Sequence, residues 1–307
     1  MPLSTREAYG EALCQLADKY DFLVLDADLS KATKTIDFAK LHPERFFNIG
    51  IAEGNLMSTA AGIASCGQTV FASTFAVFAA GRAFEQVRNS VAYTSLNVKI
   101  AATHGGVLIG PDGGSHQAIE DIGTMRTLPN MTILVPSDEL STIAAVETAI
   151  NHDGPVYLRF GRFPSDDIYT SKPDIKIGKG TLLIDGSDVT LIGIGDMVSE
   201  CLKAAAILKE QNVSAAVIDM CSVKPVDKEL IIKYADKTGV VVTAEDHNII
   251  NGLGSSAAEV LAENGNAKLG RIGLQDTFGR SGSREDLLEY FHLSAKDIAE
   301  KALSLLK

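Results

Sequence analysis

The sequence predicts an α/β protein with two domains, each built around a mainly parallel β-sheet. Short apolar runs alternate along the chain with segments of helical apolar spacing. This alternation lapses once, past the middle of the chain, and then restarts. Near-continuous apolar strands that alternate with helices are typical of a parallel sheet covered on both faces. The length of 307 residues fits two domains of ordinary size.

The first half contains five runs that are typical of buried strands. They lie at residues 22–28, 69–74, 98–103, 132–137 and 156–161. Helical apolar spacing is found between them, at residues 53–66, 78–93 and 139–151. Prolines and turn-forming residues then interrupt the pattern over 164–186. We therefore predict a first domain over residues 1–170 and a linker over residues 171–186.

The second half, residues 187–307, is predicted to form the other α/β domain. Strands are expected at residues 189–195, 214–220, 239–245 and 268–273. Helices are expected up to residue 208, from residue 227, and over residues 255–263 and 295–306.

The composition excludes several function classes. Asp and Glu number 39 against 28 Lys and Arg, so the formal net charge is -11, and no basic run offsets it. Nucleic acid is not an expected partner, because phosphate repels an acidic surface. No segment approaches the roughly 18 apolar residues of a membrane span, so no membrane partner is expected. The N-terminal residues are polar where a signal peptide would be apolar, and we predict a cytoplasmic location.

The sequence offers no metal site and no phosphate-binding loop. The cysteines lie far apart without CxxC spacing, so we expect reduced thiols and neither zinc nor disulfides. Neither GxxxxGK[ST] nor a convincing GxGxxG follows a predicted strand. GIGD at 193–196 is interpreted as a tight turn. The chain therefore shows no diphosphate-binding loop of its own.

The densest polar cluster is the Gly-rich stretch THGGVLIGPDGGSHQAIED at residues 103–121. It follows a predicted strand, and open α/β sheets bind ligands at the carboxyl ends of their strands. Its His104, Asp112 and His116 are candidate acid–base or ligand-binding groups. A metal role is disfavoured, because the Gly-rich spacer does not preset the geometry of metal ligands.

Two more segments carry candidate functional side chains. Glu53 begins an otherwise small and apolar helix, where a carboxylate either complements the helix dipole or acts as a functional acid. Phe75 and Phe78 follow a strand, and such aromatic residues are usually core but could also form the wall of a flat ligand site. The residues alone leave both alternatives open.

The motifs GIAEGN, STFAVF, THGGVLIGPDGGSHQAIED, LPNMTILVPSD and GPVYLRFGR occur in this order in the first half. Together they resemble the pyrimidine-binding domain of transketolases. The second half is similar to the transketolase C-terminal domain through AAVIDMCSVKPVD, TAEDHNIINGLGSSAAEVLAE and DTFGRSGS. Nearly the whole chain is covered, and it most resembles the separate C-terminal subunits of split transketolases.

The resemblance implies thiamine diphosphate as the cofactor, bound between two domains. In the family, one domain holds the diphosphate through Mg²⁺ or another divalent cation and carries a GDG motif followed by an asparagine, which this chain lacks. The implied partner is an N-terminal transketolase subunit, in an α2β2-type assembly. Glu53 matches the catalytic glutamate that bonds the pyrimidine atom N1′ and activates the cofactor. Phe75 and Phe78 match aromatic residues that pack on the pyrimidine ring.

The resemblance also implies roles at the substrate. His104 matches a histidine that helps to hold the substrate phosphate, and Asp112 matches an acceptor of a sugar hydroxyl. His116 matches a histidine near the reacting carbonyl, so both histidines are candidate catalytic residues. Arg6 and Arg162 match phosphate-binding arginines, since forked guanidinium donors suit phosphate oxygens.

The residue-by-residue match to the family pattern has gaps. A family serine that binds phosphate corresponds to Ala32. Either Ser30, Thr33 or Lys34 takes over its role, or the phosphate is bound in a different way. Arg159 could be confused with Arg162 in the motif LRFGR. A third family aromatic has no clear equivalent, so no role is carried onto Gly81, Arg82 or Phe84. The turn EDHNIINGLGS at 245–255 is expected to serve assembly and stability, with His247 structural.

The predicted function is that of the C-terminal subunit of a two-subunit transketolase. It would transfer a two-carbon ketol unit between sugar phosphates, as in the pentose phosphate pathway, and would need its partner subunit for activity. The alternatives are a subunit of another thiamine-diphosphate enzyme, similar to a 2-oxo acid dehydrogenase β subunit or to deoxyxylulose phosphate synthase, and a non-catalytic relative. The retained Glu53, Phe78, His104 and His116 argue against the last of these.

Overall fold

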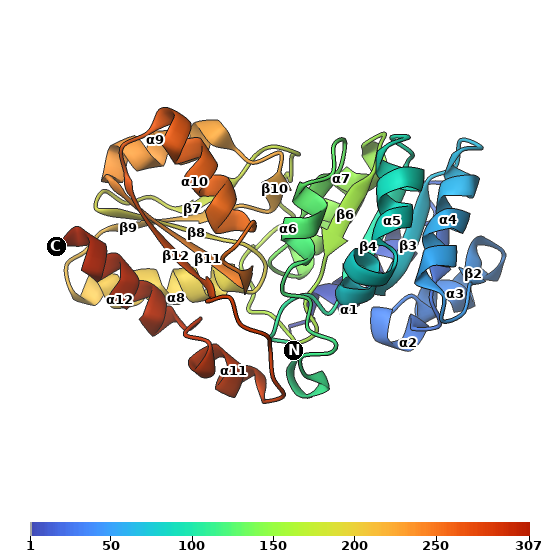
Figure 1. The fold of residues 1–307 in the computed structure, drawn as a ribbon, viewed down its shortest axis with the longest axis horizontal. Helices are drawn as coiled ribbons and strands as arrows, with labels where there is room; N and C mark the ends of the chain where they lie inside the picture. The colour runs from blue at the N-terminus through green and yellow to red at the C-terminus, as the bar shows by residue number, and fades with distance from the viewer. Residues whose placement is uncertain (1) are drawn as a thin grey trace.

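The computed structural model describes residues 2–307 and contains two β-sheets flanked by helices (Figure 1). The first sheet and its helices lie on the right of the view, and the second sheet lies on the left. Both sheets are largely parallel, so the predicted α/β class is confirmed.

The first sheet has seven strands in the order β10-β5-β6-β4-β3-β1-β2. All neighbours are parallel except β10 and β5. The strands from the first half are β1 (Leu23–Asp26), β2 (Phe46–Asn48), β3 (Val70–Phe75), β4 (Val98–Thr103), β5 (Thr132–Leu134) and β6 (Val156–Arg159). The five expected strands are therefore present, and β2 is an additional edge strand.

Helices cover both faces of this sheet because successive side chains of a strand point in opposite directions. On β1, Val24 packs in one cluster with α1 and α7, whereas Leu25 packs with α4 on the other face. The α-helices are α1 (Thr5–Leu16), α2 (Ser30–Thr33), α3 (Ile36–Leu41), α4 (Glu53–Ala64), α5 (Phe84–Gln86), α6 (Asp121–Arg126) and α7 (Glu139–Asn151). Short 3-10 turns are η1 (Pro43–Arg45) and η4 (Gly110–Asp112), and π turns are η2 (Phe78–Arg82) and η3 (Val87–Ala92).

The second sheet has five strands in the order β12-β11-β8-β9-β7, with β7 antiparallel to β9. Its strands are β7 (Thr181–Ile184), β8 (Val189–Gly193), β9 (Ala215–Asp219), β11 (Val240–Asn248) and β12 (Lys268–Leu274). Its helices are α8 (Met197–Glu210), α9 (Lys228–Thr238), α10 (Leu253–Asn264), α11 (Arg284–Tyr290) and α12 (Ala295–Leu306). α8 and α12 pack on one face, while α9 and α10 pack on the other (Figure 1).

Two strands differ from the sequence-based expectation. The range predicted as linker, 171–186, contains the edge strand β7, whose residues alternate between half-buried and exposed. The strand β10 (Ser222–Lys224) comes from the second half of the chain but pairs with β5 of the first sheet. Lys224 Nζ also donates to the carbonyl of Arg126 at 2.8 Å. The chain therefore crosses back between the two sheets after β9.

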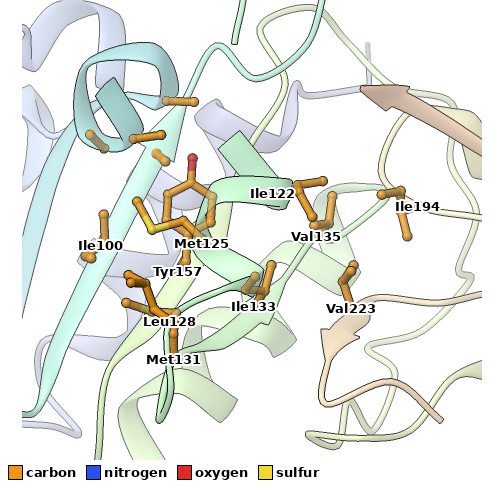
Figure 2. Packing of buried hydrophobic residues seen from close by; sticks show 14 of the residues in the cluster. Ile100, Ile122, Met125, Leu128, Met131, Ile133, Val135, Tyr157, Ile194 and Val223 are labelled. Carbon is orange, nitrogen blue, oxygen red and sulfur yellow. The ribbon is translucent and has the colours of Figure 1, made fainter. Parts of the chain in front are cut away.

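The two halves share one continuous hydrophobic cluster. Ile122 and Val135 from the first half lie near Ile194 and Val223 from the second half (Figure 2). Burying apolar area at this junction stabilises their relative position, because burial is worth roughly 25 cal/mol per Å².

Within residues 2–307, no helix combines the length and apolarity that a membrane crossing demands. The four cysteines are free thiols, and the groups of Cys201 and Cys221 are buried.

Candidate functional site

The candidate site lies at the carboxyl ends of β3 and β4. Phe75 is the last residue of β3, and His104 directly follows Thr103 at the end of β4. These two strands are parallel neighbours, so their ends meet at one edge of the sheet. This is the edge where open α/β sheets bind ligands.

Glu53 is the first residue of α4 and is only 4% exposed. The positive end of the helix dipole favours a carboxylate at this position. Glu53 Oε1 accepts a hydrogen bond of 3.2 Å from Nη1 of Arg82. Arg82 belongs to the segment that follows β3, so the carboxylate lies beside the aromatic residues of that segment.

The aromatic residues form a stack. The rings of Phe75 and Phe78 have centroids 5.7 Å apart and are nearly parallel. The imidazole of His104 stacks on Phe75 with centroids 3.9 Å apart. His116 meets Phe78 edge-on, with centroids 5.6 Å apart. Offset and edge-on arrangements are those that aromatic rings prefer.

His104 has a left-handed backbone, with φ of 59°, which is uncommon for a residue with a side chain. Its side chain is almost fully buried, and Nδ1 lies 2.9 Å from Thr103 Oγ1. Burial, together with the positive charges of Arg6 and Arg162, lowers the pKa of His104 to about 3. His104 is therefore a neutral imidazole at neutral pH, not the cationic group that a phosphate ligand would first suggest.

A cationic corner lies next to His104. Arg6 Nε donates to the carbonyl of Arg162 at 3.0 Å, and Arg6 Nη1 lies 3.5 Å from His104 Nε2. Arg162 Nη1 pairs with Asp112 Oδ2 at 2.8 Å. All the predicted substrate residues thus gather at one end of the sheet, although Asp112 itself is exposed.

Two of the three residues that could replace the family serine at Ala32 already have partners. Ala32 contributes its carbonyl, which accepts from Arg6 Nη1 at 3.0 Å. The hydroxyl of Thr33 donates to Asp26 Oδ2 at 2.7 Å, and Lys34 Nζ donates to Glu7 Oε1 at 2.9 Å. Thr33 and Lys34 therefore have partners within the chain and do not simply replace a serine at position 32.

The second half of the chain holds the loop that carries the two histidines. Asp246, in β11, accepts hydrogen bonds from the backbone N–H groups of Val107 at 2.8 Å and Leu108 at 3.1 Å. Burial raises the pKa of Asp246 to about 6. Gly106 has φ of 84°, and a Cβ there would overlap Asp246 Oδ2, so this approach requires glycine. Gln117 Nε2 donates to the carbonyls of Val107 and Arg280.

Arg159 has a structural role and is not part of the cationic corner formed by Arg6 and Arg162. Its Nε donates to Asp121 Oδ2 at 2.8 Å, and its Nη2 donates to the carbonyl of Asp246 at 2.9 Å. Asp121 is fully buried, and a buried pair of this kind is costly to break. Between the two arginines of LRFGR, Arg162 is therefore the one that faces Asp112.

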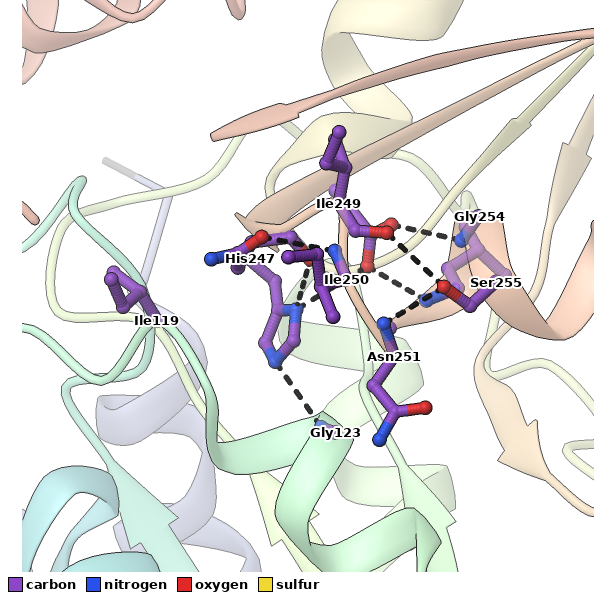
Figure 3. Close-up of polar contacts among 12 residues, drawn as sticks. Ile119, Gly123, His247, Ile249, Ile250, Asn251, Gly254 and Ser255 are labelled. Atoms are coloured by element: carbon purple, nitrogen blue, oxygen red, sulfur yellow. Dashed lines mark hydrogen bonds and ion pairs between the residues drawn. The ribbon is translucent and has the colours of Figure 1, made fainter. Parts of the chain in front are cut away.

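His247, in β11, forms a hydrogen bond to α6 of the first domain (Figure 3). Its Nε2 accepts from the N–H of Gly123 at 3.2 Å, so its Nδ1 donates to the carbonyl of Asn248 at 2.6 Å. Burial lowers the pKa of His247 to about 4, which keeps this neutral form. These contacts fit the structural role expected from the sequence.

The site suits a flat, nitrogen-containing ring. Glu53 supplies a buried carboxylate that can bond a ring nitrogen, and Phe78 is half-buried beside it. Among the described residues, no group of three His, Cys, Asp or Glu side chains is placed to hold a metal ion. The carboxylate and aromatic rings therefore fit an aminopyrimidine.

Two contacts were missed by sequence reasoning. The Arg82–Glu53 contact lies in the segment to which the family pattern did not carry over, and that irregularity was its only signal. The Asp246 contact lies in the turn EDHNIINGLGS, which was singled out but not connected to the loop.

The two α/β domains, with a carboxylate beside stacked aromatic rings at the strand ends, place the chain in the class of thiamine-diphosphate enzymes. Residues 1–163 match the family model for the transketolase pyrimidine-binding domain, and residues 178–298 match that for the transketolase C-terminal domain. The chain therefore belongs to the transketolase family.

Similar proteins agree with this assignment. A protein of Methanocaldococcus jannaschii, assigned as a transketolase C-terminal section, is 50% identical and covers 98% of this chain and 96% of its own length. A 6-deoxy-6-sulfo-D-fructose transketolase subunit of Clostridium sp. (strain MSTE9) is 42% identical over 97% of this chain and 92% of its own length. Human transketolase is 35% identical over 99% of this chain, but this match spans only 49% of the human protein.

Among solved structures, one is described as a split gene transketolase in an inactive beta4 tetramer. It shares 48% sequence identity with a TM-score of 0.92, and the match covers 100% of this chain and 99% of that chain.

Proposed function

We propose that this chain is the pyrimidine-binding subunit of a cytoplasmic, thiamine-diphosphate-dependent transketolase. It transfers a two-carbon ketol unit from a ketose phosphate to an aldose phosphate, as in pentose phosphate metabolism. A separate N-terminal subunit holds the cofactor's diphosphate through Mg²⁺ or another divalent cation. Two chains of each kind form an α2β2-type assembly.

The residues that would hold the cofactor are Glu53, Phe75 and Phe78. The cofactor supplies the nucleophilic carbon for ketol transfer, whose reactivity depends on a carboxyl group bonded to its pyrimidine ring. Glu53 lies at a helix start with 4% exposure, where water competes little for that bond. Phe75 and Phe78 exclude water and provide an apolar wall for the ring.

The substrate residues surround this place. His116, half-buried and edge-on to Phe78, is positioned to exchange a proton with a sugar oxygen near the cofactor. Neutral His104 contributes hydrogen bonds, and Asp112 accepts from a sugar hydroxyl. Arg6 and Arg162 attract the substrate's terminal anion, because both carry guanidinium donors and Arg6 Nε donates to the backbone carbonyl of Arg162 at 3.0 Å, which keeps the two residues together.

The observation that carries the proposal is the convergence of Glu53, Phe78, His104 and His116 on one edge of the first sheet. A scaffold protein would have no need for a buried carboxylate beside an aromatic stack. The named sugars of relatives differ: one is a 6-deoxy-6-sulfo-D-fructose transketolase subunit and another an apulose-4-phosphate transketolase subunit. The position of Ala32, without a hydroxyl, favours testing sugars with different terminal anions.

Reconstitution tests the proposal. The chain would be mixed with its partner subunit, thiamine diphosphate and Mg²⁺, and assayed for ketol transfer from xylulose 5-phosphate to ribose 5-phosphate, with sulfonated and branched sugars in parallel. We expect transfer only when both chains are present. Turnover by this chain alone would contradict the need for a partner. Condensation of pyruvate with an aldose phosphate, without ketol transfer, would favour the deoxyxylulose phosphate synthase alternative.

A further inference from the structure

Arg82 makes two contacts at the place assigned to the aminopyrimidine ring. Its Nη1 donates to Glu53 Oε1 at 3.2 Å, and its Cζ lies 4.2 Å from the centroid of the Phe78 ring. One planar cation therefore touches both the carboxylate and the aromatic ring that would bind the cofactor.

The guanidinium group shares the recognition chemistry of that ring. It is planar, carries N–H donors in its plane and stacks on aromatic faces. An aminopyrimidine bound to Glu53 and packed on Phe78 would also place a flat, nitrogen-containing edge against the carboxylate. The two groups cannot bond the same carboxylate oxygen and cover the same part of Phe78 at once.

The carboxylate of Glu53 needs a partner when no ring is bound. It is only 4% exposed, and a buried carboxylate without a partner is strongly destabilising. Within residues 2–307, Arg82 is the one basic side chain that forms an ion pair with it. The contact thus satisfies Glu53 in the free chain.

Arg82 is also free to leave. Its side chain is 58% exposed, and it ends the π turn η2, an irregular segment of a kind that often marks functional sites. The preceding Gly81 faces open space, with nothing within 4 Å of where a Cβ would lie. More than half of the Arg82 side chain already faces solvent, so an outward movement of the guanidinium meets open space at Gly81.

We propose that Arg82 is a placeholder, which pairs with Glu53 and covers Phe78 in the free chain and is displaced when the aminopyrimidine of the cofactor binds. This inference rests on the proposed function. Arg82 would keep the empty site ordered, and its displacement would lower the affinity of the chain for the cofactor.

The first test uses the free chain without any cofactor. Arg82→Met should lower the thermal midpoint by about 2 °C or more, since it leaves Glu53 buried without a partner. The matched control is Arg88→Met, because Arg88 is exposed in the nearby π turn η3 and bonds only its neighbour Asn89. In a chain that already carries Glu53→Gln, Arg82→Met should have much less effect. Equal effects in both backgrounds would overturn the pairing.

The second test is calorimetric titration of the assembled two-subunit protein with thiamine diphosphate and Mg²⁺. Arg82→Met should bind the cofactor about 3- to 10-fold more tightly than wild type, and Arg88→Met should bind like wild type. Arg82→Lys keeps the charge but not the planar group, so it provides a folded variant with an intermediate affinity. Unchanged or weaker binding by Arg82→Met, beside normal wild-type binding, would overturn the placeholder alone. No binding by wild type would overturn the proposed function, and the placeholder with it.

Discussion

Asp246→Asn tests whether the second domain positions the Gly-rich loop at residues 103–121, which carries His104 and His116. Both carboxylate oxygens of Asp246 accept backbone N–H groups, from Val107 at 2.8 Å and Leu108 at 3.1 Å. Asparagine has one carbonyl oxygen, so one buried N–H would face an NH₂ group. Leaving a buried donor unpaired costs about 1–3 kcal/mol, and this loop carries His104 and His116. If this cost acts on the placement of the loop, KM for the sugar substrate should rise about 5- to 150-fold.

The assay is steady-state ketol transfer by the reconstituted two-subunit enzyme, with cofactor affinity measured in parallel. Asp276→Asn is the matched control, because Asp276 is an exposed carboxylate of the same domain that accepts one bond of 3.3 Å from Asn248. We expect cofactor affinity to stay near the wild-type value in both variants, because Asp246 touches the loop and not the pyrimidine side. Wild-type KM in a folded Asp246→Asn enzyme would refute the reasoning.

Three other changes test separate parts of the site. Gly106→Ala should disturb the loop as Asp246→Asn does, because a Cβ at this position overlaps Asp246 Oδ2 and the φ of 84° is strained for alanine. We expect a higher KM for the sugar substrate and a lower melting temperature than in wild type. The pKa of His104 is lowered to about 3, so its neutral form stabilises the fold above pH 6.5 and this contribution is lost as the pH falls. When the pH falls from 7 to 5, wild type should therefore lose about 2 kcal/mol of unfolding free energy that His104→Gln keeps. Denaturant titration of both proteins at the two pH values measures this difference. Arg162→Gln should raise KM for a sugar phosphate at least about 10-fold and affect a non-phosphorylated ketose much less, since it removes a charge-assisted contact to the anion; equal effects on both substrates would count against an anion site.

Many helices and strands can be predicted from the sequence because they follow local patterns. The last helix, Ala295–Leu306, matches its predicted range, since a Ser294 cap precedes a regular amphipathic stretch. The strands at 98–103 and 189–195 are recognisable because most of their residues are small or apolar and β-branched residues are frequent in both. The strand β10 has only three residues and gains its partner from the other half of the chain, so no local pattern marks it.

The site was predictable where it follows the order of motifs and unpredictable where it depends on long-range contacts. Glu53, Phe78 and His104 come from three separate segments, and the order of these segments indicated that they belong together. The contact of Arg82 with Glu53 depends on the path of the irregular turn η2. The hydrogen bonds from Val107 and Leu108 to Asp246 join residues 139 and 138 positions apart. Local sequence patterns cannot predict contacts over such separations.

The central claim is that this chain supplies the pyrimidine side of a two-subunit transketolase, with Glu53 as its key carboxylate. The most direct test compares wild type and Glu53→Gln in the reconstituted enzyme, with single-turnover ketol transfer as the readout. The account predicts that wild type transfers the ketol unit only with its partner and cofactor, and that a folded, partner-bound Glu53→Gln loses at least about 100-fold in rate. Full activity of Glu53→Gln would contradict it.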